Sequence, residues 1–79
     1  MKVKVHGVRS IYITGKYIKL DSLLKYASIV STGGEAKHRI KNEEVYVSGD
    51  ICTSRGKKIT PGTVVRCGEN TILVKQADP

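Results

Sequence analysis

The stretch that decides the fold runs from Ile18 to Gly49, IKLDSLLKYASIVSTGGEAKHRIKNEEVYVSG. In helical projection its first part places four apolar side chains on a stripe about 100° wide, typical of a helix that buries one side. These residues are Leu20, Leu23, Leu24 and Ala27. After a break at residues 31–34, Ala36 and Ile40 share one face of a second helical pattern. The stretch therefore predicts two short helices joined by a tight turn and followed by a strand.

Strand patterns surround this pair of helices. Val3 and Val5 alternate with lysines, and Ile11 and Ile13 alternate with polar residues, so an N-terminal hairpin is one interpretation. The V-Y-V run at 45–47 predicts a strand that ends in a Ser-Gly-Asp turn, and a loop then extends to residue 60. Residues 63–67 and 71–75 predict a C-terminal hairpin. The order is strands, two helices, then three strands.

The length and the charge limit the function. Seventy-nine residues form one small domain over residues 1–79, too small for a second lobe around a deep substrate cleft. Fourteen Lys and Arg against seven Asp and Glu give a formal charge of +7, which favours a polyanionic partner. Nucleic acid is the leading candidate, and an anionic membrane surface comes second. A generically basic protein without such a partner is the remaining alternative.

Composition also indicates a cellular compartment and argues against catalysis. The N-terminus lacks the apolar run of a signal peptide, and no stretch approaches the roughly 18 apolar residues of a membrane span, so we expect a cytoplasmic protein. Cys52 and Cys67 lie fifteen residues apart without zinc-site spacing, and two reduced thiols are expected. His6 and His38 lack a nucleophile pattern nearby. We expect no catalytic residue, metal, cofactor or small-molecule substrate.

The second helical pattern separates its charges. With Ala36 and Ile40 facing the core, the 100° step gathers a basic flank of Lys37, His38 and Lys41. Glu35 and Arg39 fall on the far side, four residues apart and oppositely charged, so we expect Glu35 to neutralise Arg39 partly. The uncompensated flank is where phosphates would settle, and a merely solvated charged face is the alternative.

The start of this helix carries a second signal. Thr32 can cap it, and Glu35 three residues later completes a capping box. Gly33 and Gly34 in the first turn cost helix stability. That cost is explained either by a very tight turn or by a phosphate that approaches the backbone closely.

Other basic and aromatic residues extend the candidate interface. Lys19 and Tyr26 are seven residues apart and so lie on one side of the first helical pattern, outside its apolar stripe. Lys19 could contact the same phosphates as the helix flank. Tyr26 either stacks on a base or, more commonly, covers the edge of the core. A glycine-containing loop carries Arg55, Lys57 and Lys58. This loop either wraps RNA backbone or is simply solvated.

Three runs of the chain together resemble the S4 RNA-binding domain, most closely the small stand-alone bacterial S4-like proteins of the YaaA and YbcJ type. The runs are LDSLLKYA, STGGEAKHRIKNEEVYVSGD and RGKKITPGTVV, within residues 11–67, with the motif core at about 18–67. The resemblance implies an α+β fold of the αL type, with two short helices packed on a small bent antiparallel sheet of about four to five strands. It also implies binding to structured RNA, in association with ribosomal RNA or the ribosome. Thr32-Gly33 stands where many S4 domains have Ser-Arg, so backbone amides would substitute for that arginine.

The resulting hypothesis is a non-catalytic, monomeric RNA-binding module. A DNA-binding helix-turn-helix protein and an adaptor of the translation machinery that docks an acidic protein are the alternatives. The residues expected to contact RNA are Lys19, Thr32, Gly33, Gly34, Lys37, His38, Lys41, Arg55, Lys57 and Lys58.

Overall fold

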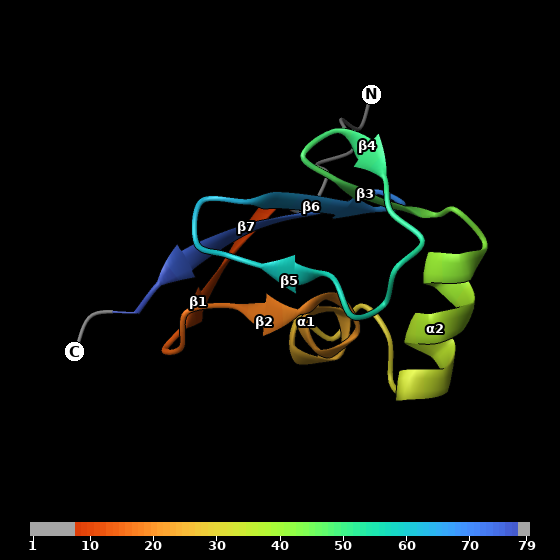
Figure 1. The fold of residues 1–79 in the computed structure, drawn as a ribbon, viewed down its shortest axis with the longest axis horizontal. Helices are drawn as coiled ribbons and strands as arrows, with labels where there is room; N and C mark the ends of the chain where they lie inside the picture. The colour runs from red at the N-terminus through yellow and green to blue at the C-terminus, as the bar shows by residue number, and fades with distance from the viewer. Residues whose placement is uncertain (1–7, 78–79) are drawn as a thin grey trace, which may run out of the picture.

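Two helices and a small second sheet pack against a five-stranded sheet in the computed structural model, which describes residues 8–77 (Figure 1). The helices are α1 (Leu20–Tyr26) and α2 (Gly33–Lys41). The large sheet has the order β1-β7-β6-β3-β4, and the small sheet pairs β2 with β5. The strands are β1 (Val8–Ile13), β2 (Ile18–Lys19), β3 (Val45–Val47), β4 (Asp50–Ile51), β5 (Lys58–Ile59), β6 (Val64–Cys67) and β7 (Asn70–Gln76).

Both helices bury the faces that the sequence predicts. The four residues of the α1 stripe are at most 2% exposed, and Ala36 and Ile40 of α2 are fully buried. With seven residues, α1 is too short to be stable alone, so packing on the sheet must hold it. Within residues 8–77 no polar or charged side chain is buried. The groups that could carry a function therefore lie on the surface.

The large sheet is mixed, not purely antiparallel as expected. β1 pairs in parallel with β7, in a register that aligns Val8 with Thr71 and Ile13 with Gln76. The other pairs of this sheet are antiparallel. A parallel pair needs a long crossover connection, which here contains both helices. The expected partner of β1 in an N-terminal hairpin, around Val3 and Val5, lies outside the described residues.

The segment from residue 50 to residue 60 is more ordered than the loop that the sequence predicts. It contains β4 and β5, each two residues long and therefore too short to give a periodic signal. Ser48 and Gly49 join β3 to β4 with φ of 51° and 90°, as in the primed two-residue turns of hairpins. The C-terminal hairpin of β6 and β7 is confirmed. No described helix has the length and apolar character that crossing a membrane requires.

Candidate nucleic-acid interface

The basic flank of α2 points away from the core. Lys37, His38 and Lys41, which we call the helix group, are all exposed. None of them forms an ion pair with another residue of the described chain. Their charges are therefore available to an anionic ligand from solvent.

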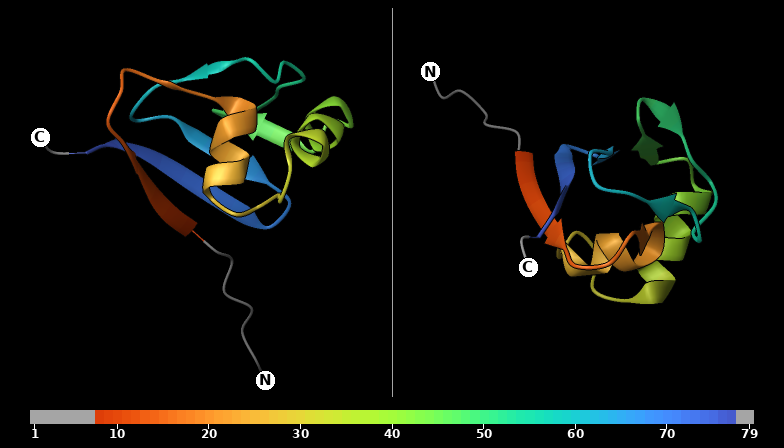
Figure 2. Two further views of the ribbon diagram at one scale, coloured as in Figure 1. Left: turned by 90° about the horizontal axis from the view of Figure 1, so that it is seen from below. Right: turned by 60° about the vertical axis from the view of Figure 1, so that its left-hand side comes forward.

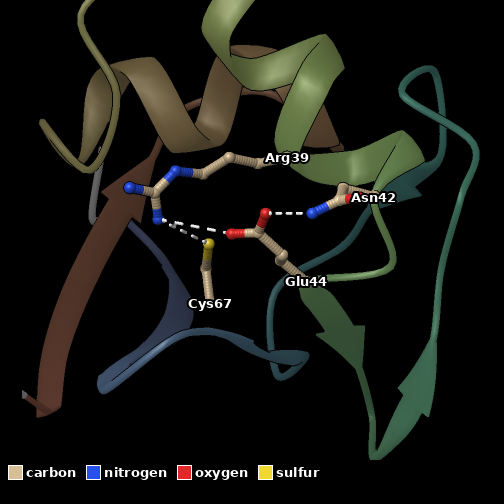
Figure 3. Close-up of polar contacts among 4 residues, drawn as sticks. All are labelled: Arg39, Asn42, Glu44 and Cys67. Atoms are coloured by element: carbon tan, nitrogen blue, oxygen red, sulfur yellow. Dashed lines mark hydrogen bonds and ion pairs between the residues drawn. The ribbon is translucent and has the colours of Figure 1, made fainter.

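Arg39 leaves the opposite side of α2 and is held against the sheet (Figure 3). Its Nη1 donates to Cys67 Sγ at 3.6 Å and lies 3.9 Å from Oε1 of Glu44. The other carboxylate oxygen of Glu44 accepts from Asn42 Nδ2 at 2.7 Å. The expected partial neutralisation by Glu35 is weak: the Glu35 carboxylate accepts from the Ser31 backbone N–H at 3.0 Å, and its charge is the smallest of the causes that raise the pKa of Arg39. The contact with Cys67 is the largest cause of the raised pKa of Arg39. Its guanidinium is charged at any physiological pH. Arg39 is thus engaged within the fold and not part of the helix group.

Side-chain caps fix the turn before α2. Thr32 Oγ1 accepts from the Glu35 N–H at 3.1 Å, which confirms the predicted cap. The reciprocal bond of the capping box is displaced by one residue, since Glu35 receives the N–H of Ser31 and not that of Thr32. The N–H groups of Gly33 and Gly34 have no acceptor among the described residues.

Nothing within the described fold requires glycine at these two positions. A Cβ atom on Gly33 would meet no atom within 4 Å, and one on Gly34 would meet only Thr32 Oγ1 at 3.9 Å. Neither glycine has a positive φ. The glycine pair was explained either by a very tight turn or by a phosphate close to the backbone, and the first explanation is therefore not supported.

Lys19 lies with the second basic cluster instead of with the helix group. It pairs with Lys58 across the antiparallel β2–β5 ladder. The loop before β5 is bound to the start of α1, where the Leu20 N–H donates to the Lys57 carbonyl at 2.9 Å and the Asp21 N–H to the Arg55 carbonyl at 3.1 Å. We call Lys19, Arg55, Lys57 and Lys58 the loop group, and all four are exposed.

The loop group concentrates positive charge on closely spaced residues. Lys58 Nζ lies 5.0 Å from the centroid of the Tyr17 ring, and no member of the group forms an ion pair within residues 8–77. Like charges directly opposite each other on a ladder destabilise it. An anion bound between Lys19 and Lys58 would relieve this repulsion.

A hollow of 520 Å³ beside the loop group is lined by hydroxyl groups. It lies between the β3–β4 hairpin and the strands that follow, with Lys57, Lys58 and Asp50 also at its wall. The hydroxyl residues are Ser48, Thr53, Ser54, Thr60 and Thr63. Their hydroxyls can donate to phosphate and sugar oxygens. Sequence reasoning missed them because no spacing connects residues that come from separate turns.

The two basic groups lie on neighbouring segments. In Figures 1 and 2 the chain between β4 and β5, which carries Arg55 and Lys57 of the loop group, runs alongside α2. The exposed amides of Gly33 and Gly34 belong to the same helix as the helix group. The arrangement offers phosphate contacts over an extended surface and not in one enclosed cavity.

The metal-ligating and thiol side chains of the described residues are dispersed. Among residues 8–77, no three His, Cys, Asp or Glu side chains are grouped so that they could hold a metal ion. Cys52 and Cys67 are free thiols, the second of them buried. The exposed cations and the hydroxyl residues around the first hollow are suited to binding an anionic ligand.

Comparisons with known proteins agree with this geometry. A family model described as S4 domain matches residues 11–75. The fold is similar to the solution structure of a tyrosyl-tRNA synthetase C-terminal domain, with a TM-score of 0.71 and 27% sequence identity over 87% of this chain and 78% of that chain. No curated protein matches the chain.

Proposed function

The chain belongs to the S4 domain family, whose members are generally RNA-binding modules, and from this premise we propose that it binds structured ribosomal RNA without catalysing a reaction. It would do so as a single domain over residues 1–79, as a monomer in the cytoplasm. The proposed contacts are the helix group, the loop group and the turn at Thr32, Gly33 and Gly34.

One observation carries the proposal: two groups of exposed cations lie on adjacent segments and lack carboxylate partners within the described chain. RNA backbone supplies closely spaced phosphates that can reach both groups at once, whereas a single small anion would reach one. The similarity to a domain of a tRNA synthetase supports structured RNA as the ligand class. Ribosomal RNA as the target rests on the resemblance to small stand-alone S4-like proteins.

The salt dependence of binding tests the helix group. Replacing Lys37 and Lys41 together by alanine is expected to weaken binding of a blunt ribosomal RNA hairpin about 20-fold at about 0.15 M salt. The slope of log affinity against log salt should fall by about 0.7 to 0.9 for each phosphate that the variant no longer neutralises. Fluorescence anisotropy over a salt series measures both quantities.

A matched control separates this surface from total charge. Arg9 and Arg66 are exposed on β1 and β6 of the large sheet and belong to neither basic group. Exchanging both for glutamine removes the same charge from outside the proposed interface, and we expect little change in slope. An unchanged slope in the Lys37, Lys41 double variant would remove the helix group from the interface. Tighter binding to duplex DNA than to the hairpin would favour the helix-turn-helix alternative.

Gly34→Ala tests the turn before α2. Since a Cβ atom there meets only Thr32 Oγ1 at 3.9 Å, the variant should gain about 0.5 to 1 kcal/mol of folding stability from its better helix propensity. Binding to the same hairpin should weaken several-fold, because the side chain obstructs a phosphate at the backbone amides. Thermal unfolding and anisotropy measure the two effects, and a gain in stability with unchanged affinity would contradict a phosphate contact at this turn.

A further inference from the structure

A second hollow is lined by three of the four aromatic residues of the chain. Tyr12 at the end of β1, Tyr17 before β2 and Tyr26 at the end of α1 converge on a cavity of 470 Å³, within the range of about 300 to 1,000 Å³ typical of ligand sites. Ile13, Ile18 and Ser22 are also at its wall. The three rings are 43 to 62% exposed, so they do not serve the core.

Cations stand over two of the rings. Lys58 Nζ lies 5.0 Å from the Tyr17 ring centroid, and Lys75 Nζ lies 5.9 Å from that of Tyr12. Lys58 also belongs to the loop group and lines the first hollow, so the Tyr17 side of this second hollow lies next to the proposed RNA surface. A chain of phosphates that follows the loop group past Lys58 would bring its bases to the tyrosine rings.

We propose that this hollow binds an unpaired nucleobase of the RNA, next to the structured part held by the basic groups. The inference rests on the proposed function and adds a second class of contact to it. Every base has an aromatic face that stacks on tyrosine, and lysines beside the rings can hold the flanking phosphates. The wall has few polar side chains, Ser22 and Thr14 among them, so stacking should tolerate different bases.

The test compares three RNAs that share one hairpin: a blunt form, a form with a short single-stranded overhang of uridines, and a form whose overhang has the same phosphates but abasic sugars. We expect the wild-type protein to bind the uridine overhang at least about fivefold more tightly than the abasic one. Tyr17→Leu and Tyr26→Leu should each reduce this ratio towards one, and Tyr26→Phe should keep it. Tyr46→Leu is the control, because Tyr46 does not line the hollow. Its ring contacts Arg66 instead, whose Cζ lies 4.6 Å from the ring centroid.

Two outcomes separate this inference from the proposed function. Equal affinity of the wild-type protein for the uridine and abasic overhangs would overturn the inference, while binding of the blunt hairpin would still support the function. Failure to bind any of the three RNAs would overturn both. Intrinsic fluorescence gives an independent readout because the chain has no Trp: the tyrosine emission should be quenched more by the uridine overhang than by the abasic one.

Discussion

Replacing Lys19, Arg55, Lys57 and Lys58 together by glutamine is expected to weaken binding of a blunt RNA hairpin by about 10² to 10³-fold at about 0.15 M salt. Each phosphate contact changes the affinity as salt concentration to the power of about −0.7 to −0.9. Relative to about 1 M salt, each contact therefore contributes roughly four- to sixfold at about 0.15 M, and four contacts multiply. Anisotropy titrations at several salt concentrations measure the decrease in affinity.

The same substitutions should not reduce the folding stability of the protein. Lys19 and Lys58 face each other across the β2–β5 ladder, so removing both charges should leave the free energy of unfolding unchanged or slightly higher. A variant in which Arg9, Lys16, Lys25 and Arg66 are exchanged for glutamine has the same net charge and is the control. A similar decrease in affinity in this control would show that overall charge, not the loop group, determines binding.

Patterns within short stretches of the sequence correctly predicted both helices, their buried faces and the cap of α2. The apolar stripe of α1, the buried pair Ala36 and Ile40, and the Thr32 cap all depend on spacings within one or two helical turns. The resemblance to the S4 domain added the fold class, which the structural comparison confirms.

Long-range pairing was beyond those patterns. The parallel β1–β7 pair joins residues about sixty positions apart, and its direction depends on the path of the chain through both helices. The Arg39 contact with Cys67 spans 28 positions, whereas the sequence offered Glu35 four residues away. Where two partners compete, the tertiary arrangement decides between them.

The candidate site shows the same division. Exposure of the helix group follows from helix geometry alone, so sequence reasoning could place it. Lys19 joined the loop group because β2 and β5, too short to predict, bring it opposite Lys58. The tyrosine hollow depends on the relative position of β1, the following turn and α1, and only the assembled fold reveals it.

Leu24→Ala should have the largest effect on folding. Leu24 is fully buried on the inner face of α1, and a helix of seven residues cannot persist without such packing. Removing its side chain should leave a cavity and cost about 2 to 5 kcal/mol, a large part of the roughly 5 to 15 kcal/mol that a folded domain has. Urea unfolding followed by circular dichroism measures the change in the free energy of unfolding.

Ile51→Ala provides the matched comparison for this core variant, because it also shortens an aliphatic side chain but at a position that is 48% exposed on β4. A surface change of this kind should alter stability by no more than about 0.5 kcal/mol. The Leu20 and Asp21 N–H groups of α1 also hold the backbone of the loop group. If Leu24→Ala loosens α1 at temperatures below global unfolding, it should therefore also weaken RNA binding at those temperatures. If Leu24→Ala and Ile51→Ala proved equally stable, packing of the α1 stripe could not be what holds this helix against the sheet.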